Sequence, residues 1–192
     1  MLLIGMIILS YLIGAIPCGL IVGKAIYHKD LRRYGSGNIG ATNAFRVLGR
    51  KAGALVFLLD FFKGELAVIL GLNVIGTPCA AVLCGFFAIL GHMHSIFLQM
   101  KGGKGVSTAL GVISILMPKV AVIIVVVWGA IVFATRYVSL GSITAALMTP
   151  ILAMVFHYDK YYAIFGVIAA AFIIIKHKDN IARIRKGREN RF

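Results

Sequence analysis

The sequence predicts an all-α integral membrane protein with seven transmembrane helices, its N-terminus outside and its C-terminus in the cytoplasm. Composition and hydropathy favour this class: of the 192 residues, 60% are apolar and 14% are charged, and the mean hydropathy is +0.97. Ordinary soluble domains are about 45–50% apolar and about 25% charged. A soluble globule of this size could not bury so much apolar surface, so the membrane class remains.

The charge is strongly one-sided, with 20 Lys and Arg against six Asp and Glu, which gives a formal net charge of +14. Basic loops beside apolar spans are typical of cytoplasmic membrane topology and of contact with anionic headgroups. We therefore expect the phospholipid bilayer, and not nucleic acid, as the large partner. Cys18, Cys79 and Cys84 lie in apolar stretches without paired spacing, which favours packed core residues.

Crossing about 30 Å of hydrocarbon takes roughly 20 apolar residues. Seven segments are candidates and use most of the chain: 2–23, 53–72, 77–99, 106–117, 119–135, 137–156 and 161–175. No basic region precedes the first, so we expect a retained span and not a signal peptide. The short segment 106–117 is expected to be shielded by neighbouring helices or to border a water-filled cavity. Together the spans predict one transmembrane catalytic domain over residues 1–192.

The distribution of Lys and Arg sets the orientation. With seven crossings, 17 basic residues lie inside, against Lys119 and Lys160 outside. If segment 106–117 only entered and returned, Arg136 and the basic tail would move outside, against the usual bias of cytoplasmic loops. Seven crossings are therefore predicted, and the functional loops are expected on the cytoplasmic side.

The first candidate site is the loop 35–46, which contains GSGNIGATN and Arg46. Its glycines allow backbone N–H groups to converge on an anion, and its hydroxyl and amide side chains add neutral donors. A simple glycine-rich turn between helices is the alternative. Arg46, which can contact phosphate bidentately, favours phosphate binding.

The second candidate site is KGGKGVST at 101–108, where one apolar segment ends and the next begins. A glycine loop that enters a helix N-terminus gathers free amides, and Lys104 adds a positive charge. The loop is not a Walker A motif, since Gly105 and Val106 follow Lys104. We expect anion contact without nucleotide hydrolysis; the alternative is a tight interhelical turn with lysines at the headgroups.

The third candidate site is the tail 177–189 after the last span. His177 and Asn180 are three residues apart, so they share a face if the last helix continues. A basic tail that only binds anionic lipid is the alternative, but it does not account for these two residues. Ser139, Ser142 and Thr144, at the start of another span, could line the same site.

Charged residues also lie inside an apolar segment. Asp60 and Lys63 are three residues apart, and intramembrane charges usually pair, so a structural pair is favoured over a direct catalytic role. His92 and His94 are two residues apart and point to different sides of a helix, so packed histidines are expected and a metal site is not. No metal or other cofactor is predicted.

These motifs together resemble the bacterial acyl-phosphate:glycerol-3-phosphate acyltransferase family of the PlsY type. The resemblance rests on GSGNIGATN with Arg46, DFFKG at 60–64, GH at 91–92, KGGKGVST, SLGS at 139–142 and the tail with His177, Asn180 and Glu189. It covers essentially the whole chain, and the order of the motifs makes chance agreement improbable. It implies a multi-pass protein of the bacterial inner membrane, with its active site facing the cytoplasm, that works in phospholipid biosynthesis.

The resemblance implies acyl transfer from acyl phosphate to glycerol 3-phosphate, giving lysophosphatidic acid and phosphate. It implies three motifs: one with Ser36 and Arg46, one with the glycine loop and Lys104, and one with His177, Asn180 and a more structural Glu189. We expect the catalytic residues to be Ser36, Lys104, His177 and Asn180. The expected substrate-binding residues are Gly37, Asn38, Thr42, Asn43, Arg46, Gly102, Gly103, Gly105 and Ser142.

Catalysis is expected to rest on positioning and electrostatic stabilisation, without a covalent acyl-enzyme. His177 has a suitable ordinary pKa for a general base, but a phosphate oxygen of the donor could accept the proton instead. The alternative function is a transporter of a small organophosphate anion, since basic glycine loops also form anion sites in carriers. The crowding of basic residues on one face and the absence of an inverted repeat favour the enzyme.

Overall fold

The computed structural model describes residues 1–191, and within that range all regular structure is helical. It consists of two compact units, one of residues Met1–Ile115 and one that starts at Leu116. The first unit contains α1 (Leu2–Ala15), α2 (Cys18–Ala25), η1 (Leu31–Arg33), α3 (Ala41–Leu48), α4 (Arg50–Ile75), α5 (Pro78–Met93), η2 (Ile96–Leu98) and nearly all of α6 (Val106–Leu116). The second contains α7 (Pro118–Thr135), α8 (Val138–Val155), α9 (Lys160–Lys176) and α10 (Lys178–Arg185).

Four segments are long and apolar enough to cross a membrane: Leu2–Ala25, Pro78–Leu98, Pro118–Thr135 and Val138–Val155. The pair α9 and α10, bent by 59°, makes a fifth if it counts as one span. Helix α4 has 26 residues but carries Asp60, Lys63 and Glu65 near its middle. Seven crossings and the sides of the two termini therefore remain predictions.

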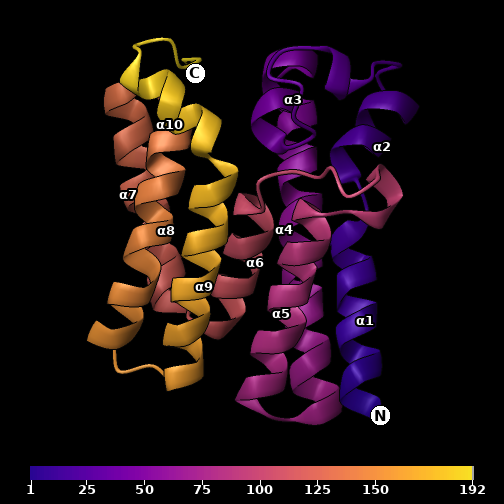
Figure 1. The fold of residues 1–192 in the computed structure, drawn as a ribbon, viewed down its shortest axis with the longest axis vertical. Coiled ribbons are helices and arrows are strands. Elements are labelled where there is room, and N and C mark those ends of the chain that lie inside the picture. The colour runs from indigo at the N-terminus through magenta and orange to yellow at the C-terminus, as the bar shows by residue number, and fades with distance from the viewer. Residues whose placement is uncertain (192) are drawn as a thin grey trace. The chain divides into compact units, whose positions relative to one another are not determined.

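In the first unit, α1, α4 and α5 lie side by side and pack against one another, while α3 packs on α4 (Figure 1). Helix α6 meets α4 closely. A side chain at Gly64 would place its Cβ 2.2 Å from the carbonyl oxygen of Thr108, so only glycine permits this approach. Ser114 of α6 donates to Glu65 Oε1 at 2.8 Å. At 1.5 Å per residue, the 11 residues of α6 extend about 16 Å, roughly half of a membrane.

The predicted first span is two helices, because α1 ends at Ala15 and α2 begins at Cys18 after Pro17. Proline has no backbone N–H, so carbonyls near the end of α1 need other donors. Ser95 Oγ donates to the carbonyl of Ala15 at 2.6 Å, and Lys63 Nζ donates to that of Ile16 at 3.0 Å. The break is therefore held by polar side chains from other elements of the same unit.

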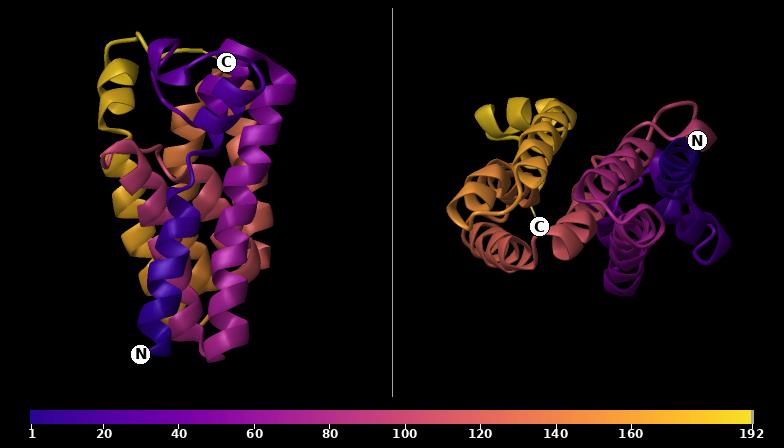
Figure 2. Two further views of the ribbon diagram at one scale, coloured as in Figure 1. Left: turned by 90° about the vertical axis from the view of Figure 1, so that its right-hand side faces the viewer. Right: turned by 90° about the horizontal axis from the view of Figure 1, so that it is seen from below.

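In the second unit, α8 packs between α7 and α9 (Figures 1 and 2). Helix α9 ends at His177, where the chain turns and α10 begins. The last helix does not continue straight through the tail, so His177 and Asn180 are arranged by a bend and not by one unbroken helix face. Two turns of this unit, at Arg136 and His157, place non-glycine residues at positive φ.

Candidate functional site

The loop 35–43 is organised around Asn43, which is 2% exposed. Its amide nitrogen donates to the carbonyls of Leu31, Tyr34 and Asn38 at 3.1, 3.1 and 2.8 Å. Its Oδ1 accepts from the backbone N–H of Ser36 at 2.9 Å. Asn43 thus holds the loop in shape through both ends of its amide.

Other amides of this loop also have partners within it. The N–H of Gly40 donates to Asn38 Oδ1 at 2.8 Å, and that of Gly37 donates to the carbonyl of Tyr34 at 3.0 Å. The N–H groups of Ser36, Gly37 and Gly40 thus bond inside the loop, and the predicted binding of an anion by the loop amides stays a prediction. The exposed Ser36 side chain and the half-buried Arg46 on α3 are the groups with chemistry suited to a phosphate.

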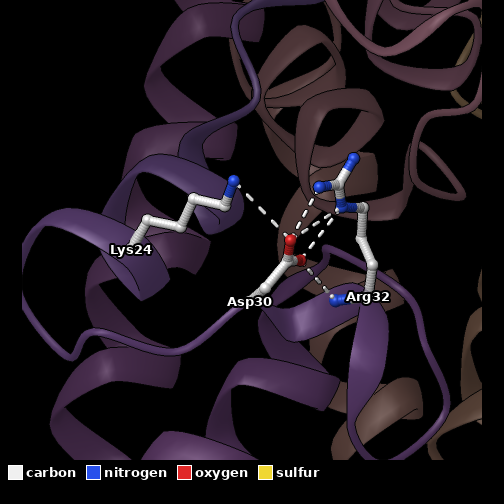
Figure 3. A network of polar contacts seen from close by, with 3 residues as sticks. All are labelled: Lys24, Asp30 and Arg32. Carbon is white, nitrogen blue, oxygen red and sulfur yellow. Dashed lines mark hydrogen bonds and ion pairs between the residues drawn. The ribbon is translucent and has the colours of Figure 1, made fainter.

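A carboxylate network precedes this loop (Figure 3). Asp30 accepts from the backbone N–H of Arg32 at 3.0 Å, from Arg32 Nε at 2.9 Å and from Arg32 Nη2 at 2.6 Å. Lys24 Nζ lies 3.6 Å from the same carboxylate. The hydrogen bonds from Arg32 hold the pKa of Asp30 well below its usual range, and Asp30 in turn raises the pKa of Arg32. Nothing in the sequence separates Asp30 and Arg32 from the other charged residues of the loop before residue 52.

The second loop rests on the end of α5. The N–H of Gly103 donates to the carbonyl of His92 at 3.0 Å, and that of Gly102 donates to the carbonyl of Met93 at 3.1 Å. A Cβ at Gly103 would lie 2.1 Å from His92 Nε2. These two glycines therefore permit close packing on His92, and their predicted role in substrate binding stays a prediction. Lys104 is half-buried beyond them, just before α6.

His92 belongs to a buried charged cluster within the first unit. Asp60 Oδ1 lies 2.8 Å from Lys63 Nζ and 3.5 Å from His92 Nδ1. The three residues are 2%, 7% and 5% exposed, respectively. Lys63 also reaches the carbonyl of Ile16 at the break between α1 and α2. The cluster links α4, the end of α5 and the α1–α2 break beneath the second loop.

The two loops meet at one cavity of about 270 Å³ in the first unit. It is lined by Arg32, Ser36, Gly37, Asn38, Ile39, Lys101 and Gly102. Four of these residues, Ser36, Gly37, Asn38 and Gly102, belong to the sites predicted from the sequence. Lys101 lies in the predicted loop 101–108 but was given no role of its own, and Arg32 lies outside both predicted loops; the two residues bring two cations to the cavity wall. Residues about 65 positions apart in the chain are thus brought to one place.

In the second unit the tail is organised around Glu189, which is 8% exposed. Glu189 accepts from Ser139 Oγ at 2.8 Å, from Asn180 Nδ2, and from Arg183 Nε at 2.7 Å. Burial alone would raise the pKa of Glu189, but these hydrogen bonds outweigh it and hold the pKa below its usual value. The sequence analysis did not single out Arg183, since nothing in its spacing separates it from the other arginines of the tail.

His177 and Ser142 also lie buried in this unit, at 2% and 4% exposed. His177 Nδ1 lies 2.8 Å from the carbonyl oxygen of Ile173, and since a carbonyl only accepts, Nδ1 carries the proton. In the neutral ring, Nε2 then carries the lone pair. Ser142 Oγ donates to the carbonyl of Val138 at 2.9 Å.

Comparison with known proteins identifies the family of this chain. The family model described as glycerol-3-phosphate acyltransferase matches residues 4–187. A glycerol-3-phosphate acyltransferase of Fusobacterium nucleatum is 44% identical over 186 residues, which cover 97% of this chain and 96% of that protein. Glycerol-3-phosphate acyltransferase 2 of Bacillus anthracis is 46% identical over 185 residues, covering 96% of each.

Solved structures agree with these relatives. The crystal structure of PlsY (YgiH), an integral membrane glycerol 3-phosphate acyltransferase, in its glycerol 3-phosphate form matches with a TM-score of 0.95 and 40% identity. The match covers 100% of this chain and 96% of that one. The lysophosphatidic acid form of the same enzyme matches with a TM-score of 0.93 and 39% identity, over the same shares of each chain.

Proposed function

We propose a specific reaction for this chain, which belongs to the glycerol-3-phosphate acyltransferase family of integral membrane proteins. In this reaction the protein transfers a fatty acyl group from acyl phosphate to glycerol 3-phosphate. The products are 1-acyl-glycerol 3-phosphate, which is lysophosphatidic acid, and inorganic phosphate. The reaction would supply phospholipid biosynthesis.

The observation that carries this proposal is the cavity shared by the two loops. Both substrates present phosphate groups, and the cavity wall contains Arg32, Lys101 and the hydroxyl-bearing Ser36. Cationic and hydroxyl donors are the groups that bind phosphate in proteins. Lys104 and Arg46 lie on the same two segments and add positive charge.

An acyl phosphate donor fits the residues that this chain offers. Acyltransferases that use acyl-CoA or acyl-carrier protein share a His and an Asp that are separated by four residues. In this chain the positions where such an Asp would follow His92 and His94 are occupied by Phe97 and Gln99. Phosphate is a good leaving group on an acyl carbon, so little covalent help is needed.

The proposed step is a direct displacement. The 1-hydroxyl oxygen of glycerol 3-phosphate attacks the acyl carbonyl carbon, a carbon–oxygen bond forms, and the bond from that carbon to the phosphate oxygen breaks. The hydroxyl proton passes to a phosphate oxygen of the donor. Positively charged side chains hold the phosphates and stabilise the developing negative charge, so positioning and electrostatics supply most of the rate.

His177 is the alternative proton acceptor, because its protonated Nδ1 leaves Nε2 as the basic nitrogen. A general base typically contributes 10²–10⁴-fold to the rate. Loss of less than about tenfold in His177→Ala turnover would support the donor phosphate as acceptor, and a larger loss would support the imidazole.

The proposed location is the bacterial inner membrane, with the site on the cytoplasmic face. The support is the distribution of basic residues, which are concentrated in the loops before 52, around 101–104 and after 176. Acyl phosphate can then enter from the bilayer, which solvates its chain, while glycerol 3-phosphate enters from the cytoplasm.

Phosphate release by the purified protein in lipid or mild detergent tests the proposal. The substrates are palmitoyl phosphate and glycerol 3-phosphate, with palmitoyl-CoA as the competing donor and Lys104→Ala as the control. Release with palmitoyl phosphate alone, lost in Lys104→Ala, supports the proposal. Release with neither donor contradicts it, and uptake of labelled glycerol 3-phosphate into proteoliposomes would then test the transporter.

A further inference from the structure

The guanidinium of Arg32 is held in a defined orientation, although Arg32 lies in an exposed loop. Its Nε and Nη2 both donate to the carboxylate of Asp30, at 2.9 and 2.6 Å, and its backbone N–H donates to the same group at 3.0 Å. Lys24 approaches the carboxylate from the other side, at 3.6 Å. A guanidinium held along one edge keeps its plane and its direction, which a lysine cannot do.

The opposite edge of this guanidinium is available for a ligand. In Figure 3 one terminal nitrogen of Arg32 points away from Asp30, and the Arg32 side chain is 49% exposed. Arg32 lines the cavity of about 270 Å³ together with Ser36 and Lys101. Asp30 is not among the lining residues, and its negative charge is paired with Arg32 and Lys24.

We propose that Arg32 and Lys101 form a phosphate-binding subsite on the wall of this cavity, and that Asp30 is the positioning residue that orients Arg32. The ligand class is a phosphate monoester or an acyl phosphate. The proposal rests on the proposed function, since both of its substrates carry such a group. It assigns roles to Asp30 and Arg32, which lie outside the three motifs, and to Lys101, the first residue of the second motif.

The geometry explains why two cations from distant segments are needed. The amides of Ser36, Gly37 and Gly102 already bond to other groups of their own unit, so positive side chains are the groups best placed to meet the charge of a phosphate. Arg32 supplies a planar fork from η1, and Lys101 supplies a point charge from the start of the second loop.

Arg33 provides a matched control. It is the neighbour of Arg32 on η1, it is exposed and equally charged, and it does not line the cavity. A general effect of positive charge at a membrane surface would be the same for both arginines. A subsite would distinguish them.

The test is steady-state kinetics of Arg32→Ala, Arg32→Lys, Lys101→Ala, Asp30→Asn and Arg33→Ala with palmitoyl phosphate and glycerol 3-phosphate varied separately. For Arg32→Ala we expect KM to rise about tenfold or more for one of the two substrates, with kcat within about threefold. Lys101→Ala should raise KM for the same substrate. Arg32→Lys and Asp30→Asn should each raise it about threefold, because the charge remains while the fork or its direction is lost. Arg33→Ala should match wild type.

The substrate whose KM responds identifies the phosphate that is bound. The proposal is overturned if Arg32→Ala leaves both KM values within about twofold of wild type, if Arg33→Ala has the same effect, or if Lys101→Ala affects the other substrate.

Titration calorimetry of the full chain in detergent with inorganic phosphate separates this proposal from the proposed function. Binding at least about tenfold tighter in wild type than in Arg32→Ala supports the subsite even if no acyl transfer is measured. Equal affinity, or no binding to either protein, contradicts it.

Discussion

Asp60 and Glu189 are both buried carboxylates, but they are stabilised in different ways. Asp60 lies inside an apolar helix and is paired with Lys63 at 2.8 Å and His92 at 3.5 Å. Glu189 lies in the tail and accepts from two neutral side chains, Ser139 and Asn180, and from one partly exposed cation, Arg183. The two sites indicate that a carboxylate buried in the middle of an apolar helix is balanced by a matched positive charge, whereas one in the tail is satisfied mainly by hydrogen bonds.

The two carboxylates also organise different parts of the molecule. Asp60 contacts His92, on which the second loop packs. It also contacts Lys63, which donates to the carbonyl of Ile16 at the α1–α2 break. Glu189 joins the start of α8 to α10 and the tail. If this account is correct, changes at Asp60 should affect stability most, and changes at Glu189 should be smaller and pH-dependent.

The largest effect is expected for Asp60→Asn. The substitution keeps the shape of the side chain but leaves the buried Lys63 without its partner, which should cost about 3–5 kcal/mol of stability. Thermal unfolding in detergent measures it. Lys63→Met in the same chain should restore part of the loss, because the unpaired charge is then removed. If the double variant loses more stability than the two single variants lose together, the loss of the ion pair is not the reason for the cost.

The next effect is expected for Gly103→Ala, which tests the link from the Asp60 cluster to the loop. The new Cβ would lie 2.1 Å from His92 Nε2, so either the loop or the buried His92 ring must shift. Overpacking of this kind costs about 1–3 kcal/mol, and a shift of about 1 Å near reacting groups can cost about 100-fold in rate. Both kcat/KM and the unfolding temperature should fall.

Gly5→Ala is the matched control for this change, since no heavy atom lies within 4 Å of its added Cβ. It lies in α1 of the same unit, so it should leave kcat/KM unchanged and should not lower the unfolding temperature, because alanine favours a helix more than glycine does. Activity of Gly103→Ala within about threefold of wild type would show that the loop position does not depend on His92.

A smaller effect is expected for Glu189→Gln, at about 1–2 kcal/mol, because hydrogen bonds to a charged acceptor are stronger than those to a neutral one. The pKa of Glu189 in the folded protein lies below its ordinary value of 4.5. The carboxylate therefore stabilises the fold above that pH, and this contribution is lost as the pH falls through the folded pKa.

The difference in stability between wild type and Glu189→Gln should accordingly be constant from about pH 6 to 8 and shrink below about pH 4.5. Unfolding by denaturant at several pH values measures it. A difference that grows as the pH falls would contradict the depressed pKa.

The positions of the later helices were predictable from the sequence. The runs 119–135 and 137–156 correspond to α7 (Pro118–Thr135) and α8 (Val138–Val155), because Arg136 is the single charged residue in the sequence between Lys119 and Asp159 and separates two largely apolar stretches. The spacing of Asp60 and Lys63 likewise suggested their pairing. Helix positions and pairs of this kind can be predicted because they depend on residues that are close together in the chain.

Other features could not be read from the sequence. The glycine loops indicated amides available to an anion, but the partners of those amides, such as Asn43 Oδ1 and the carbonyl of His92, are set by the path of the backbone. Arg32 was one loop arginine among several until the fold placed it at the cavity beside Lys101. The break at Pro17 was hidden because the apolar run continues through it.

The smallest effect is expected where a buried polar group has no partner. Within residues 1–191, Ser10 Oγ has no hydrogen-bond partner although Ser10 is 0% exposed, whereas Ser95 Oγ donates to the carbonyl of Ala15 at 2.6 Å. Ser10→Ala should leave the free energy of unfolding unchanged or raise it by less than about 1 kcal/mol, because no bond is lost. Ser95→Ala should cost about 1–3 kcal/mol, because it leaves a carbonyl at the helix break without this donor. Both serines are buried in the same unit, so equal losses in the two variants would mean that burial, and not hydrogen bonding, determines the cost of removing a hydroxyl here.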